Sequence, residues 1–435
     1  MPGTPAATSA ARSQSGRGLR VTPFRGVRFN PARVPDVAAV TSPPYDVIDP
    51  DSATHLEQLD PHNVVRLILP REEADDVPGR TSRYEHAADR LSAWQADGVL
   101  RRDDTAAMYV YEQARPGMLQ RGLLAAVELR DPDERVVLPH EDVMPGPVAD
   151  RLELMRATSA NLEPILLVYD GGGPTVEVID AAADRPPLVE TVTEDGIRHR
   201  LWALTEPAEQ RVVAEDLAPR QALIADGHHR YATYRRLQAE QHAAGRGAGA
   251  WDRGLALLVD SGAYPLDVQA IHRVVEGLAL DDAVMAAGTV FSVEALGEDE
   301  DGAWKALGEG SGHTFLLSDG ASFALLSDPD PEVLAAALPP LHTALWRALD
   351  ASVLHALLLE RLWQVEDGSP RVRYLHDGDG ALRAARRSGG TAVLMRPVSV
   401  EEVLEVTATG ERMPRKSTSF GPKPRTGFVL RLLDE

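Results

Sequence analysis

The stretch 221–237 predicts a strand, a tight turn and a helix in immediate succession. The run 221–225 is short and apolar, as in a buried strand. Gly227 then marks a sharp turn. Beyond it the apolar positions recur at helical spacing: Tyr231, Tyr234 and Leu237. The chain is therefore expected to place a helix directly after a buried strand, with a glycine turn between them.

The residues at this turn predict a site for a phosphate group. Two imidazoles and a guanidinium, from His228, His229 and Arg230, fall on the first helical turn. The backbone N–H groups of a first turn lack partners within the helix, and the helix dipole favours an anion there. We predict that 227–230 binds the phosphates of a cofactor, with Arg230 exposed and its guanidinium fork aimed at the anion. Asp226 and the two histidines are candidate catalytic groups.

Two other interpretations compete for the same residues. Asp226 could serve only as a helix N-cap, with the histidines as partly buried packing residues. A metal site is the other, because histidine is a common ligand. Adjacent helical residues point about 100° apart, so His228 and His229 are poorly placed to chelate one ion. We assign no dedicated metal site in the sequence.

Proline-flanked segments carry further candidate groups. His140 and Glu141 lie in such a turn, Tyr45 and Asp46 follow two prolines, and Arg151 opens an expected helix. Rigid loops often display functional groups. Glu141 and Asp226 are the candidate bases or ligands of a divalent ion. Tyr45, Asp46, His140 and Arg151 are candidate substrate-binding residues.

A basic loop near the end of the chain is a candidate lid. Arg415, Lys416 and Ser417 lie in the segment 412–426, which is broken by prolines. Four basic residues, Arg415, Lys416, Lys423 and Arg425, stand out in a chain of net charge -21. The segment is either a solvated tail beside the last strand or a lid that closes over an anionic ligand. We favour the lid, with Arg415, Lys416 and Ser417 contacting the substrate. We expect these residues to line one cleft with His140, Glu141 and the turn 226–230, and with Tyr45 and Asp46 at its wall.

Composition excludes several classes of function. The chain has 45 Lys and Arg against 66 Asp and Glu, so we expect no broad nucleic-acid interface. It contains no cysteine, which excludes disulfides, thiolate nucleophiles and cysteine-based metal sites. We see no secretory signal and no run of about 18 apolar residues. We therefore expect a cytoplasmic protein without membrane contact; its oligomeric state stays open.

Alternating strand and helix patterns predict an α/β or α+β fold with mixed sheets. Strands are expected at 64–69, 108–111, 123–129, 165–169 and 255–259, and helices at 84–95, 150–160 and 345–363. Three regions follow: a disordered tail at 1–18, a phosphate-binding region at 19–243, and a second, C-terminal α/β region at 250–435 that includes the lid loop 412–426.

The turn and several other segments resemble known families. Gly227-His228-His229-Arg230 resembles the Gly-x-x-Arg phosphate-binding turn of the ParB/sulfiredoxin superfamily. A longer series resembles the bacterial family named domain of unknown function 1015: Ser42–Ile48, Asn63–Leu67, Leu138–Glu141, Asp150–Leu152, Asp226–Tyr231 and Met413–Thr418. Sulfiredoxin carries a reactive cysteine where this chain has His228, so its sulfinic acid chemistry is excluded.

The superfamily resemblance implies a ParB/sulfiredoxin-like core and a nucleotide ligand. Such folds include a free-serine kinase and nucleotide-hydrolysing members. We therefore expect a phosphotransferase that uses ATP or ADP with Mg²⁺ and acts on a small hydroxylated metabolite, serine-like by extrapolation. A phosphohydrolase using the same His-His-Arg site is the alternative. A ParB-like nucleotide-binding regulator is a third, which the net charge disfavours.

Overall fold

The computed structural model describes residues 18–72, 82–366 and 369–434, and it divides into two compact units. Unit 1 comprises 1–138, 144–265 and 424–435, and unit 2 comprises 139–143 and 266–423. The expected disordered tail lies outside the described residues except for Gly18. The last segment of the chain therefore returns to unit 1 after unit 2 is complete.

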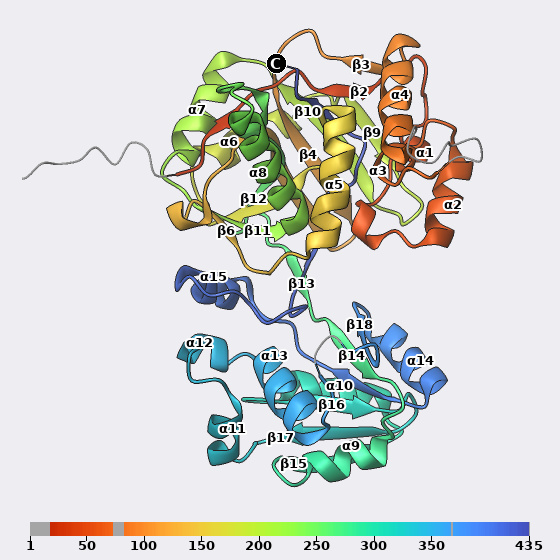
Figure 1. Cartoon of the computed structure of the whole chain (residues 1–435), viewed down its shortest axis with the longest axis vertical. Coiled ribbons are helices and arrows are strands. Elements are labelled where there is room, and N and C mark those ends of the chain that lie inside the picture. The colour runs from red at the N-terminus through yellow and green to blue at the C-terminus, as the bar shows by residue number, and fades with distance from the viewer. Residues whose placement is uncertain (1–17, 73–81, 367–368, 435) are drawn as a thin grey trace, which may run out of the picture. The chain divides into compact units, whose positions relative to one another are not determined.

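A mixed nine-stranded sheet forms the centre of unit 1 (Figure 1). Its order is β6 (Val137–Pro139), β11 (Ala222–Asp226), β8 (Ile165–Tyr169), β12 (Arg253–Asp260), β5 (Met118–Glu128), β4 (Met108–Arg115), β10 (Arg198–Leu204) and β9 (Val189–Val192), with β1 (Val21–Thr22) paired to β5. Strands β8 and β12 run parallel, whereas β12, β5, β4 and β10 pair antiparallel in turn. The expected mixed α/β architecture is confirmed.

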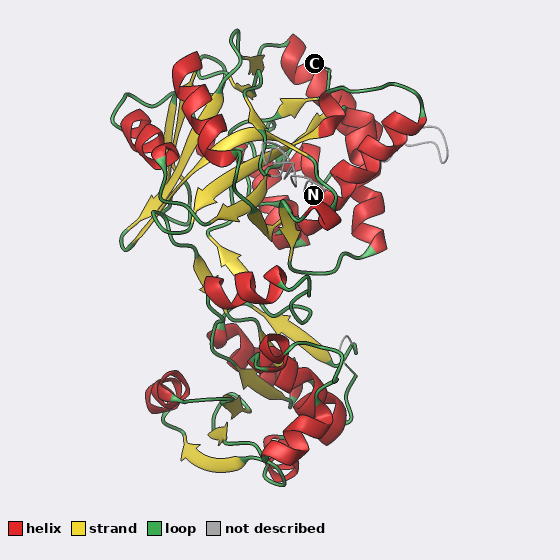
Figure 2. Ribbon diagram, turned by 90° about the vertical axis from the view of Figure 1, so that its left-hand side faces the viewer, coloured by secondary structure: helices red, strands yellow, loops and turns green. Residues whose placement is uncertain are grey.

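Helices cover this sheet, and Figure 2 distinguishes them from the strands by colour. Helices α5 (Pro145–Thr158) and α8 (His228–Ala243) pack against each other, as do α6 (Pro174–Ala183) and α7 (Pro207–Leu217). A further layer holds α1 (Val37–Val40), α2 (Pro50–Leu59), α3 (Val65–Ile68) and α4 (Arg83–Ala96), with the short pairs β2 (Val27–Phe29) with β3 (Leu100–Arg102) and β7 (Ala160–Asn161) with β21 (Arg431–Leu432). The end of the chain is thus built into this layer.

The expected strand at 64–69 is wrong, because this run forms helix α3. Asn63 is fully buried; its side chain donates to the carbonyls of Ala39 and Thr41 and accepts from the N–H of Val65. These bonds start a helical turn. The apolar residues of the run are buried on every side, so neither a twofold nor a 3.6-residue period was visible.

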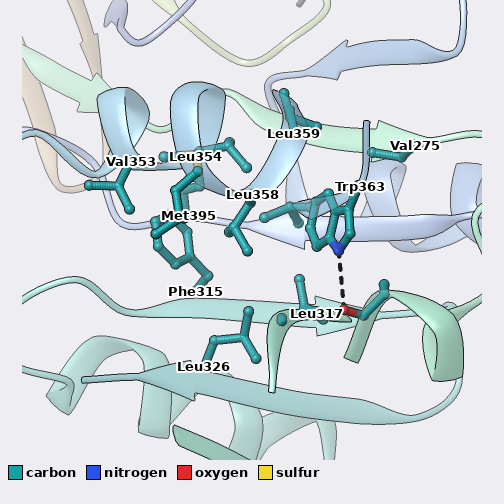
Figure 3. Packing of buried hydrophobic residues seen from close by; sticks show 14 of the residues in the cluster. Val275, Phe315, Leu317, Leu326, Val353, Leu354, Leu358, Leu359, Trp363 and Met395 are labelled. Atoms are coloured by element: carbon teal, nitrogen blue, oxygen red, sulfur yellow. Dashed lines mark hydrogen bonds between the residues drawn. The ribbon is translucent and has the colours of Figure 1, made fainter. Parts of the chain in front are cut away.

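Unit 2 contains a six-stranded sheet. Its order is β15 (Ser292–Gly297), β17 (Phe323–Ser327), β16 (Phe315–Ser318), β19 (Thr391–Leu394), β14 (His272–Val275) and β18 (Val372–Leu375). Alternate residues of β16 enter two different cores: Phe315 and Leu317 one, Leu316 the other. Because successive side chains of a strand point to opposite faces, the sheet is covered on both sides. Figure 3 shows the first core, where the Trp363 indole donates to the Ala283 carbonyl.

The helices of unit 2 include α9 (Leu280–Ala287), α10 (Glu300–Glu309), α11 (Pro331–Ala337), α14 (Gly378–Ser388) and α15 (Val400–Ala408). A separate strand pair joins β13 (Asp267–Gln269) to β20 (Ser419–Gly421). Among the residues that the structure describes, no helix is long and apolar enough to cross a membrane.

The expected continuous helix at 345–363 is wrong. The segment forms α12 (Ala344–Arg347), α13 (Asp350–Val353) and a π-helix over Leu354–Leu362. Leu349 adopts extended backbone angles between the first two pieces, and the Ser352 hydroxyl donates to the Trp346 carbonyl across the break. The apolar spacing correctly indicated helical structure in this segment, but it did not indicate the break at Leu349.

Burial of His199 in unit 1 predicts sensitivity to acid. Its ring nitrogens contact the Tyr111 and Thr193 hydroxyls at 2.8 and 3.0 Å. Burial, with a smaller effect of Arg425, lowers the pKa of His199 from 6.5 to about 4. The unfolded chain therefore binds the proton more readily, so stability is complete above about pH 6.5 and falls as the pH drops through about 4. We expect urea unfolding across this range to show a smaller loss for His199→Gln than for wild type; equal losses would contradict this.

Candidate functional site

The predicted strand, glycine turn and helix are confirmed in unit 1. Strand β11 ends at Asp226, and α8 begins at His228. Gly227 has a φ of 93°, in the left-handed region that favours glycine, and contributes no side-chain cap. The turn therefore presents the first-turn backbone of α8 without a capping side chain in front of it.

Arg230 is not the exposed clamp that the sequence predicted. It is 3% exposed; one terminal nitrogen donates to Asp226 Oδ2 at 2.5 Å and the other to the Pro164 carbonyl. Burial alone would lower the pKa of Arg230, but the carboxylates of Asp226 and Glu163 outweigh it and raise that pKa. The prediction of an exposed fork is wrong, because the guanidinium points inward and neutralises a buried carboxylate four residues earlier.

The two histidines of the turn occupy different environments. His228 is buried, whereas His229 is half-buried and its Nε2 accepts the backbone N–H of Met144 at 3.0 Å. Asp226 is 7% exposed and paired with Arg230. Asp226 is therefore a counter-ion in the structure, and a role for it or for the histidines in catalysis stays a prediction.

Tyr45 connects this turn to a second basic side chain. Its ring lies 4.3 Å from the Arg151 guanidinium carbon and 6.0 Å from that of Arg230. The Tyr45 backbone N–H donates to Glu163 Oε1 at 3.0 Å. Burial raises the pKa of Tyr45 to about 12, so the phenol stays protonated near neutral pH. The sequence candidates Tyr45 and Arg151 are thus brought together, and the exposed Asp46 follows Tyr45 in the chain.

A pocket of about 430 Å³ opens beside Tyr45 and Arg151 in unit 1. This volume lies within the usual range of small-molecule sites. Its polar lining consists of Tyr45, Asp49, Asp51, Thr54, Arg71, Arg83, Asp150 and Arg151, and its apolar lining of Ile48, Pro50, Ala53, Leu69 and Pro70. Three guanidinium groups and three carboxylates therefore surround one cavity.

One carboxylate holds two of the pocket's arginines. Asp150 Oδ1 accepts from Arg83 and the Tyr84 hydroxyl at 2.6 and 2.8 Å, and Oδ2 accepts from Arg151 at 2.6 Å. Burial raises the pKa of Asp150, but Arg151, Tyr84 and Arg83 together lower it below the ordinary value. Asp150 is therefore ionised and fixes both guanidinium groups at the wall.

The sequence candidates His140, Glu141, Arg415, Lys416 and Ser417 all lie in unit 2. The His140 Nε2 contacts the Thr418 hydroxyl at 3.0 Å, and the Glu141 carbonyl accepts from Arg412 at 2.6 Å. The Arg415 carbonyl accepts from Arg273, Lys416 has a φ of 54°, and Ser417 is buried. The convergence of these residues with Tyr45 and the Gly227 turn in one cleft stays a prediction, as does closure of 412–426 as a lid.

Several residues of the site were missed in the sequence, among them Asp49 and Asp51 of the pocket lining. Arg71 and Arg83 line the pocket, and the buried Glu163 contacts Tyr45 from behind it. Arg83 opens the correctly predicted helix α4, and Glu163 precedes a proline, but neither feature is specific. These residues become recognisable only through contacts between segments that are distant in the sequence.

Replacing Gly227 tests the strain at the turn. A Cβ there would lie 2.9 Å from Ile165 Cγ2, and its φ of 93° is unfavourable for other residues. We expect Gly227→Ala to lower the free energy of unfolding by about 1–3 kcal/mol. Gly146→Ala is the matched control, since a Cβ there meets nothing within 4 Å. Equal unfolding midpoints in urea for the two variants would contradict the expectation.

Comparison with known families identifies the chain. It belongs to the family described as protein of unknown function DUF1015, whose model matches residues 21–352. No curated protein has a significantly matching sequence.

Several solved structures match part of the chain at low sequence identity and low TM-score. A free serine kinase in complex with ADP is 15% identical, with a TM-score of 0.34 over 67% of this chain and 88% of that one. SbnI from Staphylococcus aureus is 13% identical, with a TM-score of 0.35 over 68% and 84%. A conserved hypothetical protein from Pyrococcus furiosus is 17% identical, with a TM-score of 0.33 over 68% and 93%. A likeness at this level does not assign an activity.

Proposed function

We propose that unit 1 binds a nucleotide with Mg²⁺ in the 430 Å³ pocket and transfers a phosphoryl group to a small hydroxylated metabolite. The observation that carries this proposal is the grouping of three arginines and three carboxylates around one cavity of ligand size. Phosphoryl transfer needs this combination, because the phosphates require cations and the acceptor hydroxyl requires a carboxylate that positions it.

The arginines are the proposed phosphate ligands. The side chains of Arg71 and Arg83 are 51% and 43% exposed, so both reach a ligand from the wall. Arg151 is 6% exposed and held by Asp150, which keeps it in place as a third cation. A guanidinium presents a planar fork that matches two phosphate oxygens, which makes arginine well suited to this role.

The carboxylates fit a divalent ion. Asp49 and Asp51 are exposed at the start of α2, and the N–H of Ser52 lowers the pKa of Asp49. Oxygen ligands of this kind suit Mg²⁺, which usually binds through one or two carboxylates and substrate phosphates. When bound, the ion would neutralise charge on the phosphates. Asp49 and Asp51 would hold it, and we propose one of them as the group that accepts the proton of the acceptor hydroxyl.

The Gly227 turn has a supporting part in this proposal. Arg230 packs beside the Tyr45 ring, which forms part of the pocket wall, while its own donors are used by Asp226 and Pro164. We assign Arg230 to the wall, leave the direct contacts with phosphate to Arg71 and Arg83, and keep Arg151 as the third cation of the wall. The assignment of Glu141 as base stays a prediction from the sequence.

Calorimetric titration with ATP, ADP and CTP in the presence of Mg²⁺ is the first test. We expect heat from at least one nucleotide, followed by transfer of labelled γ-phosphate to a hydroxylated acceptor such as serine. A folded protein that gives no heat with any of the three would contradict the proposal. Phosphate release from phosphorylated metabolites without a nucleotide would point instead to a phosphohydrolase, and retardation of DNA at low salt to a ParB-like regulator.

A further inference from the structure

Glu163 contacts the proposed pocket without lining it. It lies between β7 and β8 and is 5% exposed. Through Oε1 it accepts the backbone N–H of Tyr45 at 3.0 Å, and its Oε2 lies 3.9 Å from an Arg151 nitrogen. Both partners form walls of the pocket, whereas Glu163 is absent from its lining. One buried carboxyl group therefore contacts two lining residues of the pocket without lining the pocket itself.

The buried carboxyl group of Glu163 requires an explanation beyond stability. Its pKa is raised, because burial outweighs the opposing effects of Arg230 and Arg151. A buried ion pair is often no more stabilising than apolar residues of the same volume, so its presence is weak evidence for a role in stability. The Glu163 carboxyl group orients two neighbours, because it accepts the Tyr45 backbone N–H and faces the Arg151 guanidinium at the same time.

Residues 425 and 426, near the end of the chain, contact the segment 41–45 that contains Tyr45, and Thr426 also contacts Glu163. Ser42 and Thr426 exchange backbone hydrogen bonds at 3.1 and 2.8 Å, and the Thr426 hydroxyl lies 3.5 Å from Glu163 Oε1. Arg425 donates to the side chain and the carbonyl of Thr41. The segment 41–45 is thus fastened between Glu163 and the residues that return to unit 1 after unit 2.

We propose that Glu163 is a positioning residue of this pocket: it sets the places of Tyr45 and Arg151, supported by Thr426, and does not reach the ligand. The inference rests on the proposed function of the same pocket. A displacement of about 1 Å at a binding group costs up to about a hundredfold in rate or affinity, so a residue behind the wall has a measurable effect.

The test compares Glu163→Met with Glu163→Gln. Methionine keeps the length but cannot accept the Tyr45 N–H as an oxygen does, whereas the glutamine carbonyl can. With Mg²⁺ and ATP as the probe, we expect affinity to fall at least about tenfold for methionine and less than about threefold for glutamine. Hydrogen exchange of the Tyr45 amide, slow in the wild type, should accelerate only in the methionine variant. Glu163→Ala serves the same purpose should methionine prevent folding.

Glu112 provides the matched control, because it is fully buried and paired with Arg121 and Arg200 on β4 and its neighbours, outside the pocket lining. Glu112→Met should leave affinity unchanged. An equal loss in that variant, unchanged affinity in Glu163→Met, or fast Tyr45 exchange in the wild type would each overturn the positioning role. Absence of any nucleotide binding by the wild type would instead contradict the proposed function. The exchange experiment would still show whether Glu163 fixes the Tyr45 amide.

Discussion

Arg230→Ala is expected to destabilise unit 1 strongly. Arg230 is 3% exposed and pairs with Asp226 at 2.5 Å, and Glu163 is a second buried carboxylate within its electrostatic influence. Removing the guanidinium leaves Asp226 buried without its counter-ion. Removing one partner of a buried pair typically costs about 3–5 kcal/mol. Urea unfolding followed by circular dichroism should show a loss of this size.

A double variant separates this effect from a simple loss of packing. Asp226→Asn combined with Arg230→Ala removes the uncompensated charge, so it should recover part of the lost stability. Arg236→Ala is the control on the same helix, since that side chain is 55% exposed and should change stability by less than about 1 kcal/mol. An Arg230→Ala protein as stable as the wild type would show that the inward position of Arg230 is not maintained in solution.

The elements with a clear period were predictable from the sequence. Strand β8 and the unit formed by β11, Gly227 and α8 were found where the apolar spacing placed them. Helix α3 was not, because a run that is buried on every side has no period. The break at Leu349 was not either, since one residue in extended conformation leaves the spacing of its neighbours intact.

The site was predictable only in its motif residues. Tyr45 and Arg151 were singled out and do share a pocket. Arg230 was also singled out, but its spacing of four residues from Asp226 equally suits an internal ion pair, which is what the fold uses. Arg71, Arg83 and Glu163 depend on contacts between segments that only the folded chain brings together, and no local pattern records such contacts.

Replacing both exposed arginines of the pocket is expected to abolish most nucleotide binding. Arg71 and Arg83 are half-exposed on the pocket wall, where they pair with Glu57 and Asp150 and present their remaining donors to a ligand, while Asp150 also retains Arg151. A hydrogen bond to a charged group contributes about 1.5–3 kcal/mol. The double variant Arg71→Ala/Arg83→Ala should therefore bind Mg²⁺ and ATP at least about a hundredfold more weakly, as measured by calorimetry.

Stability should change little in this double variant, which distinguishes it from Arg230→Ala. The pairs that it breaks, with Glu57 and Asp150, involve side chains that remain accessible to water or to other partners, and such pairs contribute about 0–1 kcal/mol each. Arg101→Ala is the control for loss of a surface guanidinium group, because its pair with Asp104 is exposed and lies outside the pocket lining. Wild-type affinity should also fall as salt is added, since exposed guanidinium groups are screened. If Arg101→Ala weakened binding as much as the double variant, net charge rather than the pocket would account for the effect, and the assignment of Arg71 and Arg83 as phosphate ligands would be wrong.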